Sequence, residues 1–209
     1  MERGIFEIVD TESLVPAEHL LRKIDAAVDF NKIYDMVEPL YCADNGRPSV
    51  DPVVLFKMVL IQHLYGLGSL RRTAEEVRAN IYYRWFLGYR LQEDTPHFST
   101  ISYNFRHRFT SETVDQIFNW ILMEMVEAGY VAPGKETIER VFADAKEQHG
   151  MRYTRYTGLA QVTNWVKLKF AAMNLKKLAK WSWRDACINH AFSIIAFYFP
   201  QYAVNPCLA

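Results

Sequence analysis

The chain has 209 residues, of which half are hydrophobic and 14% are aromatic, so the composition excludes a disordered protein and allows one or two packed domains. Lysine plus arginine equals aspartate plus glutamate at 24 each, so any affinity for nucleic acid must come from local faces rather than from the net charge. The three cysteines lack CxxC spacing, which excludes a zinc ribbon and gives no disulfide framework.

The ends of the chain carry no targeting or membrane-spanning signal. The N-terminal residues are charged and lack the apolar stretch of a signal peptide. The most apolar run, residues 191–199, is too short to span a bilayer. These features predict a cytoplasmic protein with free thiols and no membrane partner.

The first third of the chain predicts three helices. Pro16 suits the first turn of a helix, and a second short helix is expected over residues 30–38. In the helix that begins near Pro16, the apolar residues follow helical spacing; they are Leu20, Leu21, Ile24 and Val28. Asp51 followed by Pro52 predicts the N-cap and first position of the third helix. Because that helix is apolar nearly all round, it is expected in the middle of a bundle.

Three more helical segments follow. Ser69 can cap residues 70–80, and the aromatic-rich segment after them ends at Gly88, a typical C′ position. Ser99 is expected to cap a helix over residues 100–109. The core face of that last helix would consist of Ile101, Phe105 and Phe109, at spacing i, i+4 and i+8.

The remaining faces of these helices have the composition of a DNA-binding surface. The candidate contacts are Arg71, Arg72, Thr100, Asn104, Arg106, His107 and Arg108. Arginine and threonine contact phosphates and base edges, and asparagine can read adenine. A short helix, a turn and a second helix with such a face are typical of a helix-turn-helix unit. The alternative is an ordinary solvated surface, since many surface helices carry arginine and asparagine.

Two further features of this region have plain explanations. Neither His97 nor His107 has a partner at metal-ligand spacing, so both are expected to form hydrogen bonds or face phosphates. Residues 111–128 form an amphipathic helix that ends at Gly129. Its wide apolar stripe fits a helix inside a bundle, or alternatively the seam of a dimer.

Residues 135–146 predict another amphipathic helix. Its apolar side consists of Ile138, Val141, Phe142 and Ala145. A second face places the carboxylate of Glu139 between Lys135 and Lys146. From spacing alone, a solvated ion-pair face is the simplest interpretation.

Four stretches of this sequence resemble a known family. Residues 138–159, IERVFADAKEQHGMRYTRYTGL, resemble the closing segment of the DDE transposases of insertion sequences. Three earlier segments resemble the N-terminal helical domain of the same family and occur in the same order as in that family. They are GRPSVDPVVLFKMVLIQHLYG, SLRRTAEEVRANIYYRWFLG and HFSTISYNFRHRF. The resemblance implies that this helical domain recognises the terminal inverted repeats of the element, so double-stranded DNA is the expected partner.

The same resemblance assigns roles near the end of the chain. Glu139 matches the last of three acidic metal ligands, and Lys146 matches the lysine seven residues later. The tyrosine and arginine that usually precede them are replaced here by Ala132 and Lys135. In the basic segment that follows, Arg152 and Arg155 are further expected DNA contacts. The family uses Mg²⁺.

The catalytic region of the relatives has no counterpart here. In them a long RNase H-like region, whose strands carry the first two catalytic aspartates, separates the N-terminal helices from the final glutamate helix. No alternating β-branched run occurs in this sequence. Glu139 alone would leave Mg²⁺ largely hydrated, so the metal site is expected to be incomplete, without bound Mg²⁺ and without DNA cleavage.

These inferences predict an all-α, internally deleted transposase. Residues 1–133 would form a helical DNA-binding bundle with a helix-turn-helix-like unit, residues 134–185 a remnant of the catalytic domain, and residues 186–209 an unassigned tail. The amphipathic helix over residues 161–181 would need a new partner in place of the missing sheet. It could pack on the bundle, self-associate or remain partly disordered. The expected function is binding of inverted-repeat DNA; the alternative is a helical module that pairs with itself or with intact transposase.

Overall fold

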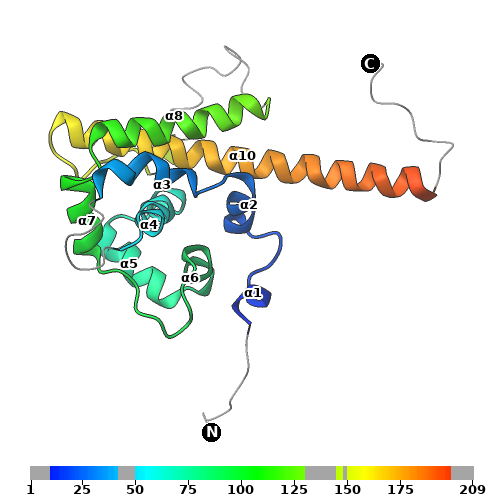
Figure 1. Ribbon diagram of the computed structural model, residues 1–209, viewed down its shortest axis with the longest axis horizontal. Coiled ribbons are helices and arrows are strands. Elements are labelled where there is room, and N and C mark those ends of the chain that lie inside the picture. Colours follow the sequence, from blue (N-terminus) through cyan, green and yellow to red (C-terminus); the bar gives the residue numbers. More distant parts are fainter. Residues whose placement is uncertain (1–9, 42–49, 130–144, 148–149, 199–209) are drawn as a thin grey trace, which may run out of the picture.

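The computed structural model describes residues 10–41, 50–129, 145–147 and 150–198, with side chains described as far as residue 184. All regular structure in these ranges is helical, which confirms the all-α prediction (Figure 1). The elements are α1 (Thr11–Leu14), α2 (Leu20–Ala27), α3 (Lys32–Val37), the 3₁₀ turn η1 (Glu38–Leu40), α4 (Pro52–Leu64), α5 (Leu70–Ala79), α6 (Ile81–Leu87), α7 (Phe98–His107), α8 (Ser111–Glu127) and α10 (Leu159–Tyr198). No helix within these ranges combines the length and apolarity needed to cross a membrane.

Helix α4 lies at the centre of the molecule, as its sequence predicts. The Asp51 carboxylate accepts a hydrogen bond from the Val53 amide at 2.7 Å, and Pro52 occupies the first position. The Tyr34 hydroxyl of α3 donates to the same carboxylate at 2.7 Å. Because α4 is apolar on all sides, it packs against α3, α5, α6 and α10 at once.

Local capping signals were correct at three positions. The Ser69 hydroxyl accepts from the Arg72 amide at 3.2 Å, so Ser69 caps α5 as predicted. Gly88 and Gly129 follow α6 and α8 with φ values of 76° and 73°. These are left-handed conformations in which any other residue would be strained.

Two predicted helix starts were wrong, and a histidine caps the helix in both cases. Helix α7 is capped by His97 and not by the hydroxyl of Ser99. The Nδ1 of His97 accepts a hydrogen bond from the backbone amide of Ser99 at 3.3 Å. His19 caps α2 in the same way, through the Leu21 amide at 3.3 Å. Pro16 therefore precedes α2, and its carbonyl accepts the His19 amide at 2.9 Å in a tight turn.

Helix α8 forms part of the bundle. Val114, Ile117, Ile121 and Met125 are buried, and α8 packs against α3 and α10. Val126, which the sequence pattern placed in the same stripe, is 45% exposed. The main apolar stripe is therefore covered within one chain.

Helix α10 finds its partner in the N-terminal bundle. It begins after Gly158 and extends to Tyr198, far beyond the end predicted at residue 181. Its apolar face packs on α2, α4 and α8 through Ala171, Ala172, Leu175, Leu178 and Ala179. Lys167 forms an ion pair with Asp115 of α8, and Lys23 of α2 lies 4.8 Å from the Trp183 ring. Figure 1 shows that the C-terminal part of α10 continues past the other helices.

Candidate nucleic-acid interface

Three consecutive helices, α5, α6 and α7, form the unit that holds most candidate DNA contacts. Asn80 ends α5 and caps α6, because its side-chain oxygen accepts the Tyr82 amide at 2.9 Å. The turn from α6 to α7 is fastened by Arg84, which is 6% exposed and donates to the carbonyls of Arg90 and Glu93. Arg84 is not among the residues predicted from the sequence, because a buried structural arginine has no local sequence signal.

The N-terminal ends of α5 and α7 lie together. The Arg71 guanidinium of α5 stacks 4.7 Å from the centre of the Phe98 ring at the start of α7. Arg72, one position later, is exposed, and 3.7 Å separates its Nε from a carboxylate oxygen of Glu76. An exposed pair of this kind is worth less than about 1 kcal/mol, so Arg72 can leave Glu76 for a phosphate at little cost.

The C-terminal half of α7 presents a second group of polar side chains. His107 and Arg106 are exposed, and the His107 ring lies 4.7 Å from the ring of Tyr103, itself 62% exposed. The Arg108 guanidinium lies 4.4 Å from the Tyr41 ring, which orients it. Exposed tyrosine, histidine and arginine side chains at one end of a helix can contact a sugar-phosphate backbone.

Asn104 does not lie on the face where the sequence placed it. It is 7% exposed, and its amide nitrogen donates to the Thr100 carbonyl at 2.8 Å. The helical wheel explains the error, since residue 104 is three positions after Ile101 and shares its buried face. Thr100 is half-buried on the same helix.

The candidates from the C-terminal segment are only partly described. Arg155 and Lys146 are exposed, and Arg152 is exposed and forms an ion pair with Glu147. Glu139 lies outside the described residues. The structure therefore does not test the proposed pairing of Glu139 with Lys146.

The carboxylates that the structure does describe do not fit a two-metal site. Within the described ranges, no group of three or more His, Cys, Asp or Glu side chains is placed to hold a metal ion. The carboxylate nearest in sequence to the expected site, Glu147, is engaged by Arg152. Two-metal phosphoryl transfer needs several converging carboxylates, so we derive no catalytic step from the described residues.

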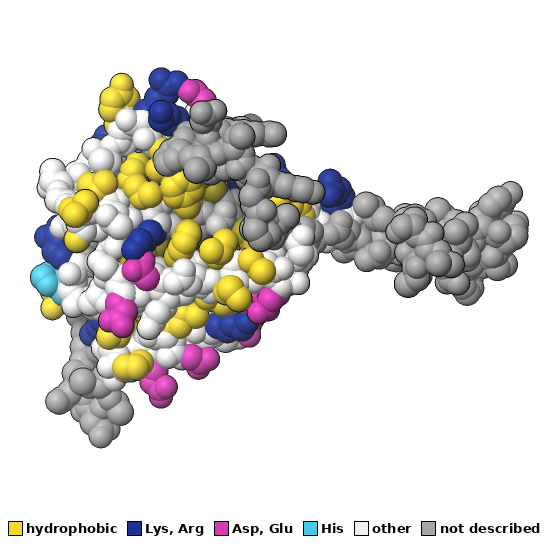
Figure 2. Space-filling model, turned by 90° about the horizontal axis from the view of Figure 1, so that it is seen from above, with side chains coloured by type: hydrophobic (Ala, Val, Ile, Leu, Met, Phe, Trp, Pro, Cys, Tyr) yellow, Lys and Arg dark blue, Asp and Glu magenta, His cyan; other side chains and the backbone are white. Residues whose placement is uncertain are grey.

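Charge on the surface is mixed. Figure 2 shows one face on which apolar side chains gather in the middle and basic and acidic side chains are scattered among and around them, without a broad area of one charge. This agrees with the balance of 24 basic and 24 acidic residues. Any attraction to DNA must come from small groups of cations such as those on α5 and α7.

Comparison with known families identifies the chain. A model described as "Transposase domain (DUF772)" matches residues 9–108, and one described as "Transposase DDE domain" matches residues 96–179. The described residues are helical, and two transposase models match consecutive parts of the sequence, so the chain is a transposase-family protein. In particular, it belongs to the DDE transposases of insertion sequences, as its motifs predict. No curated protein and no solved structure matches it.

Proposed function

We propose that this protein binds the terminal inverted-repeat DNA of its insertion sequence through α5 and α7. The observation that carries the proposal is the packing of α5 on α7, with the Arg71 guanidinium against the Phe98 ring, which places arginines on two neighbouring helices. The proposed contacts are Arg71, Arg72, Arg106, His107 and Arg108. Asn104 is left out of the base-reading set because its side chain is buried.

The contacts would divide between phosphates and bases. Arg71 and Arg108 are each stacked on an aromatic ring, at 4.7 and 4.4 Å, so their guanidinium groups lose little freedom when they bind a phosphate. Among the described residues no ring stacks on Arg106, and His107 lies against the exposed ring of Tyr103, so both side chains can turn to a base edge. Arg152 and Arg155 would add contacts to the backbone without reading sequence.

We further propose that the chain binds these DNA ends without cutting them. Resemblance supplies one metal-ligating glutamate, Glu139, where the chemistry needs several carboxylates around two Mg²⁺ ions. The catalytic region of the relatives would stand between α8 and Lys135, and only a few residues occupy that interval. The proposal is therefore an internally deleted transposase that keeps end recognition.

The binding experiment compares the parent element's inverted repeat with a scrambled duplex of equal length at two salt concentrations. We expect a preference of roughly a thousandfold or more. Arg72→Ala and Arg108→Ala should each weaken binding about tenfold. The matched control is Lys180→Ala, which removes the same charge about 30 Å along α10 from the end beside α7. Equal affinity for both duplexes, lost in high salt, would contradict end recognition.

A chain that occupies the repeats without cutting should inhibit the intact enzyme. Transposition of an intact element should fall when this protein is co-expressed, and Arg72→Ala combined with Arg108→Ala should restore it. An unchanged transposition rate would remove the inhibitory role but not the binding. Mg²⁺-dependent nicking that disappears in Glu139→Ala would instead show an active nuclease.

The alternative function, self-association through the stripe of residues 111–128, receives less support. Ile117, Ile121 and Met125 in that stripe are buried against other helices of the same chain. Pairing with a second copy or with intact transposase would have to use another surface. A molar mass that rises across micromolar concentrations would favour such pairing.

A further inference from the structure

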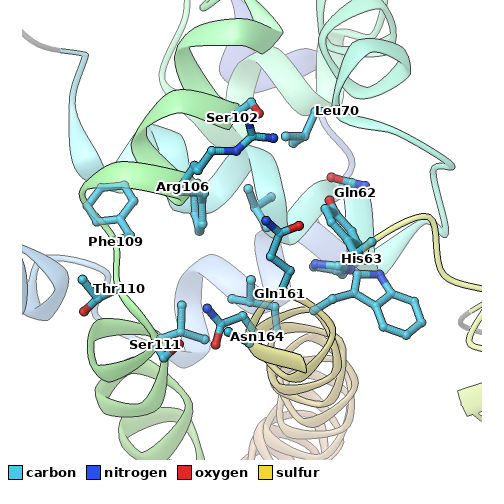
Figure 3. A pocket seen from close by; sticks show the side chains of 17 residues that line it. Gln62, His63, Leu70, Ser102, Arg106, Phe109, Thr110, Ser111, Gln161 and Asn164 are labelled. Atoms are coloured by element: carbon cyan, nitrogen blue, oxygen red, sulfur yellow. The ribbon is translucent and has the colours of Figure 1, made fainter. Parts of the chain in front are cut away.

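A partly open cavity with a mostly apolar lining and a few polar groups lies beside the proposed DNA-binding helices. It has a volume of about 440 Å³ and is lined by residues of α4 and α7 and of the starts of α5, α8 and α10 (Figure 3). Pockets for small molecules have volumes of roughly 300–1,000 Å³. The proposed interface uses only Arg106 among the lining residues, so most of this cavity has no assigned role.

Two buried polar atoms at this cavity lack a hydrogen-bond partner. His63, on α4, is 3% exposed and lines the cavity, and its Nδ1 has no partner in the described part of the chain. The side-chain oxygen of Asn164, on α10, is also buried at this cavity and has no hydrogen-bond partner among the described residues. Burial lowers the pKa of His63 to about 3, with a smaller effect of Lys169, so the imidazole is neutral. Unsatisfied groups of this kind are stabilised by a ligand that bonds to them.

The rest of the lining favours a planar anion. The aromatic rings of Phe105, Tyr156 and Trp165 provide flat apolar surface. Arg106 is the cation of the lining, is exposed, and forms no ion pair with a described acidic residue. The lining contains hydroxyl and amide groups but no carboxylate, so nothing in it repels an anion. Figure 3 shows Arg106, Ser102, Gln161 and Asn164 around the same hollow.

We propose that this cavity binds a single nucleotide, with the base between the aromatic side chains and the phosphate at Arg106. Every base has a face that stacks on aromatic rings, and its edge can donate to the Asn164 oxygen and bond with His63. Arginine binds phosphate through paired N–H donors. The nucleotide can be free in solution or an unpaired nucleotide of a DNA strand. Only the second source rests on the proposed function, because it requires DNA bound at α7.

The first test uses free nucleotides and calorimetry on the whole protein. The probes are dAMP and deoxyadenosine, which differ only in the phosphate. We expect dAMP to bind at least tenfold more tightly, and Arg106→Gln to abolish that difference while leaving deoxyadenosine binding unchanged. Asn164→Leu, which keeps the side-chain size but removes the acceptor, should weaken both ligands several-fold.

A plugging variant separates the cavity from the fold. Ala160 is exposed and lines the cavity, so Ala160→Trp should fill it without disturbing the core. The matched control is Ala79→Trp, at an exposed alanine of α5 outside the lining. We expect Ala160→Trp to lose nucleotide binding at unchanged thermal stability, and Ala79→Trp to keep it. Equal nucleotide binding by Ala160→Trp and Ala79→Trp would overturn the proposal. So would a native protein that binds neither dAMP, nor deoxyadenosine, nor an unpaired nucleotide in DNA.

The second test distinguishes the two sources. A duplex with one unpaired adenine should bind more tightly than the fully paired duplex, and Ala160→Trp should cancel that difference if the nucleotide comes from a DNA strand. If only dAMP responds to Ala160→Trp, the cavity is a site for free nucleotides. Equal affinity for the inverted repeat and the scrambled duplex, together with dAMP binding that Ala160→Trp removes, would reject the proposed function while keeping the cavity's role.

Discussion

At the scale of single residues, the polar groups inside the bundle differ in how they are held. Lys57 is enclosed and bonded: its Nζ donates to Asp25 at 2.7 Å and to the Phe86 carbonyl at 3.1 Å, over two phenylalanine rings. His63 is enclosed without a partner for Nδ1. Lys169, 4% exposed, has its pKa lowered to about 8 by burial. Lys57 therefore stabilises the fold, whereas Nδ1 of His63 has no hydrogen-bond partner among the described residues and Lys169 lies 5.9 Å from the centre of the Trp165 ring.

The first prediction concerns the pH dependence of stability. His63 has a pKa of about 3 in the folded protein and an ordinary value of 6.5 in the unfolded chain, so the unfolded state binds the additional proton between these values. Its stabilising contribution is complete above pH 6.5 and is lost at about 1.4 kcal/mol per pH unit as the pH falls below it. His63→Gln should flatten the free energy of unfolding, measured in urea, between pH 7 and pH 5. An unaltered slope would contradict the assignment.

The second prediction concerns Lys57. Lys57→Met keeps the apolar stem but removes two hydrogen bonds and two cation–π contacts, so we expect the free energy of unfolding to fall by about 1–3 kcal/mol. Lys32→Met is the control, because the Lys32 side chain is 48% exposed although its Nζ lies 2.6 Å from Glu124. That exposed pair should contribute less than about 1 kcal/mol. Urea unfolding of both variants checks the order.

At the scale of elements, the helix ends are determined locally and the helix partners are not. Asp51 caps α4 and Ser69 caps α5, each through an amide two or three residues ahead. Whether the apolar face of α10 packs on a sheet, on another chain or on the bundle depends on residues more than a hundred positions away, in α2 and α4.

The third prediction tests that packing. Leu175 of α10 is 1% exposed within the core, so Leu175→Ala should lower the free energy of unfolding by about 2–5 kcal/mol. Lys180→Ala, at an exposed position on the same helix, should change it by no more than about 0.5 kcal/mol. Thermal and urea unfolding measure both. If the two variants have equal stability, α10 does not pack on the bundle in solution.

At the scale of the whole molecule, the matched transposase regions form one helical body. The segment matched by the "Transposase DDE domain" model includes α7, α8 and the first half of α10, and α10 covers α2, α4 and α8. Among the described residues, helices from both sides of residue 133 contribute to one hydrophobic core.

The fourth prediction follows from this shared core. A chain that ends at Gly158 would expose the faces of α2, α4 and α8 that α10 covers. We expect it to lose its cooperative thermal transition and to bind a hydrophobic dye, while the native chain does neither. Circular dichroism and dye fluorescence provide the measurement. A cooperative transition in the shortened chain would mean that residues 10–129 fold alone.

The sequence by itself determined the helical class, the family and most helix ends, because periodicity, caps and motifs depend on residues a few positions apart. It failed where two signals competed at short range, as at Ser99, where His97 provides the cap instead. Tertiary structure decided the burial of Asn104, the partner of α10 and the cavity beside His63. These features arise when distant segments exclude water together, and no local pattern encodes which segments meet.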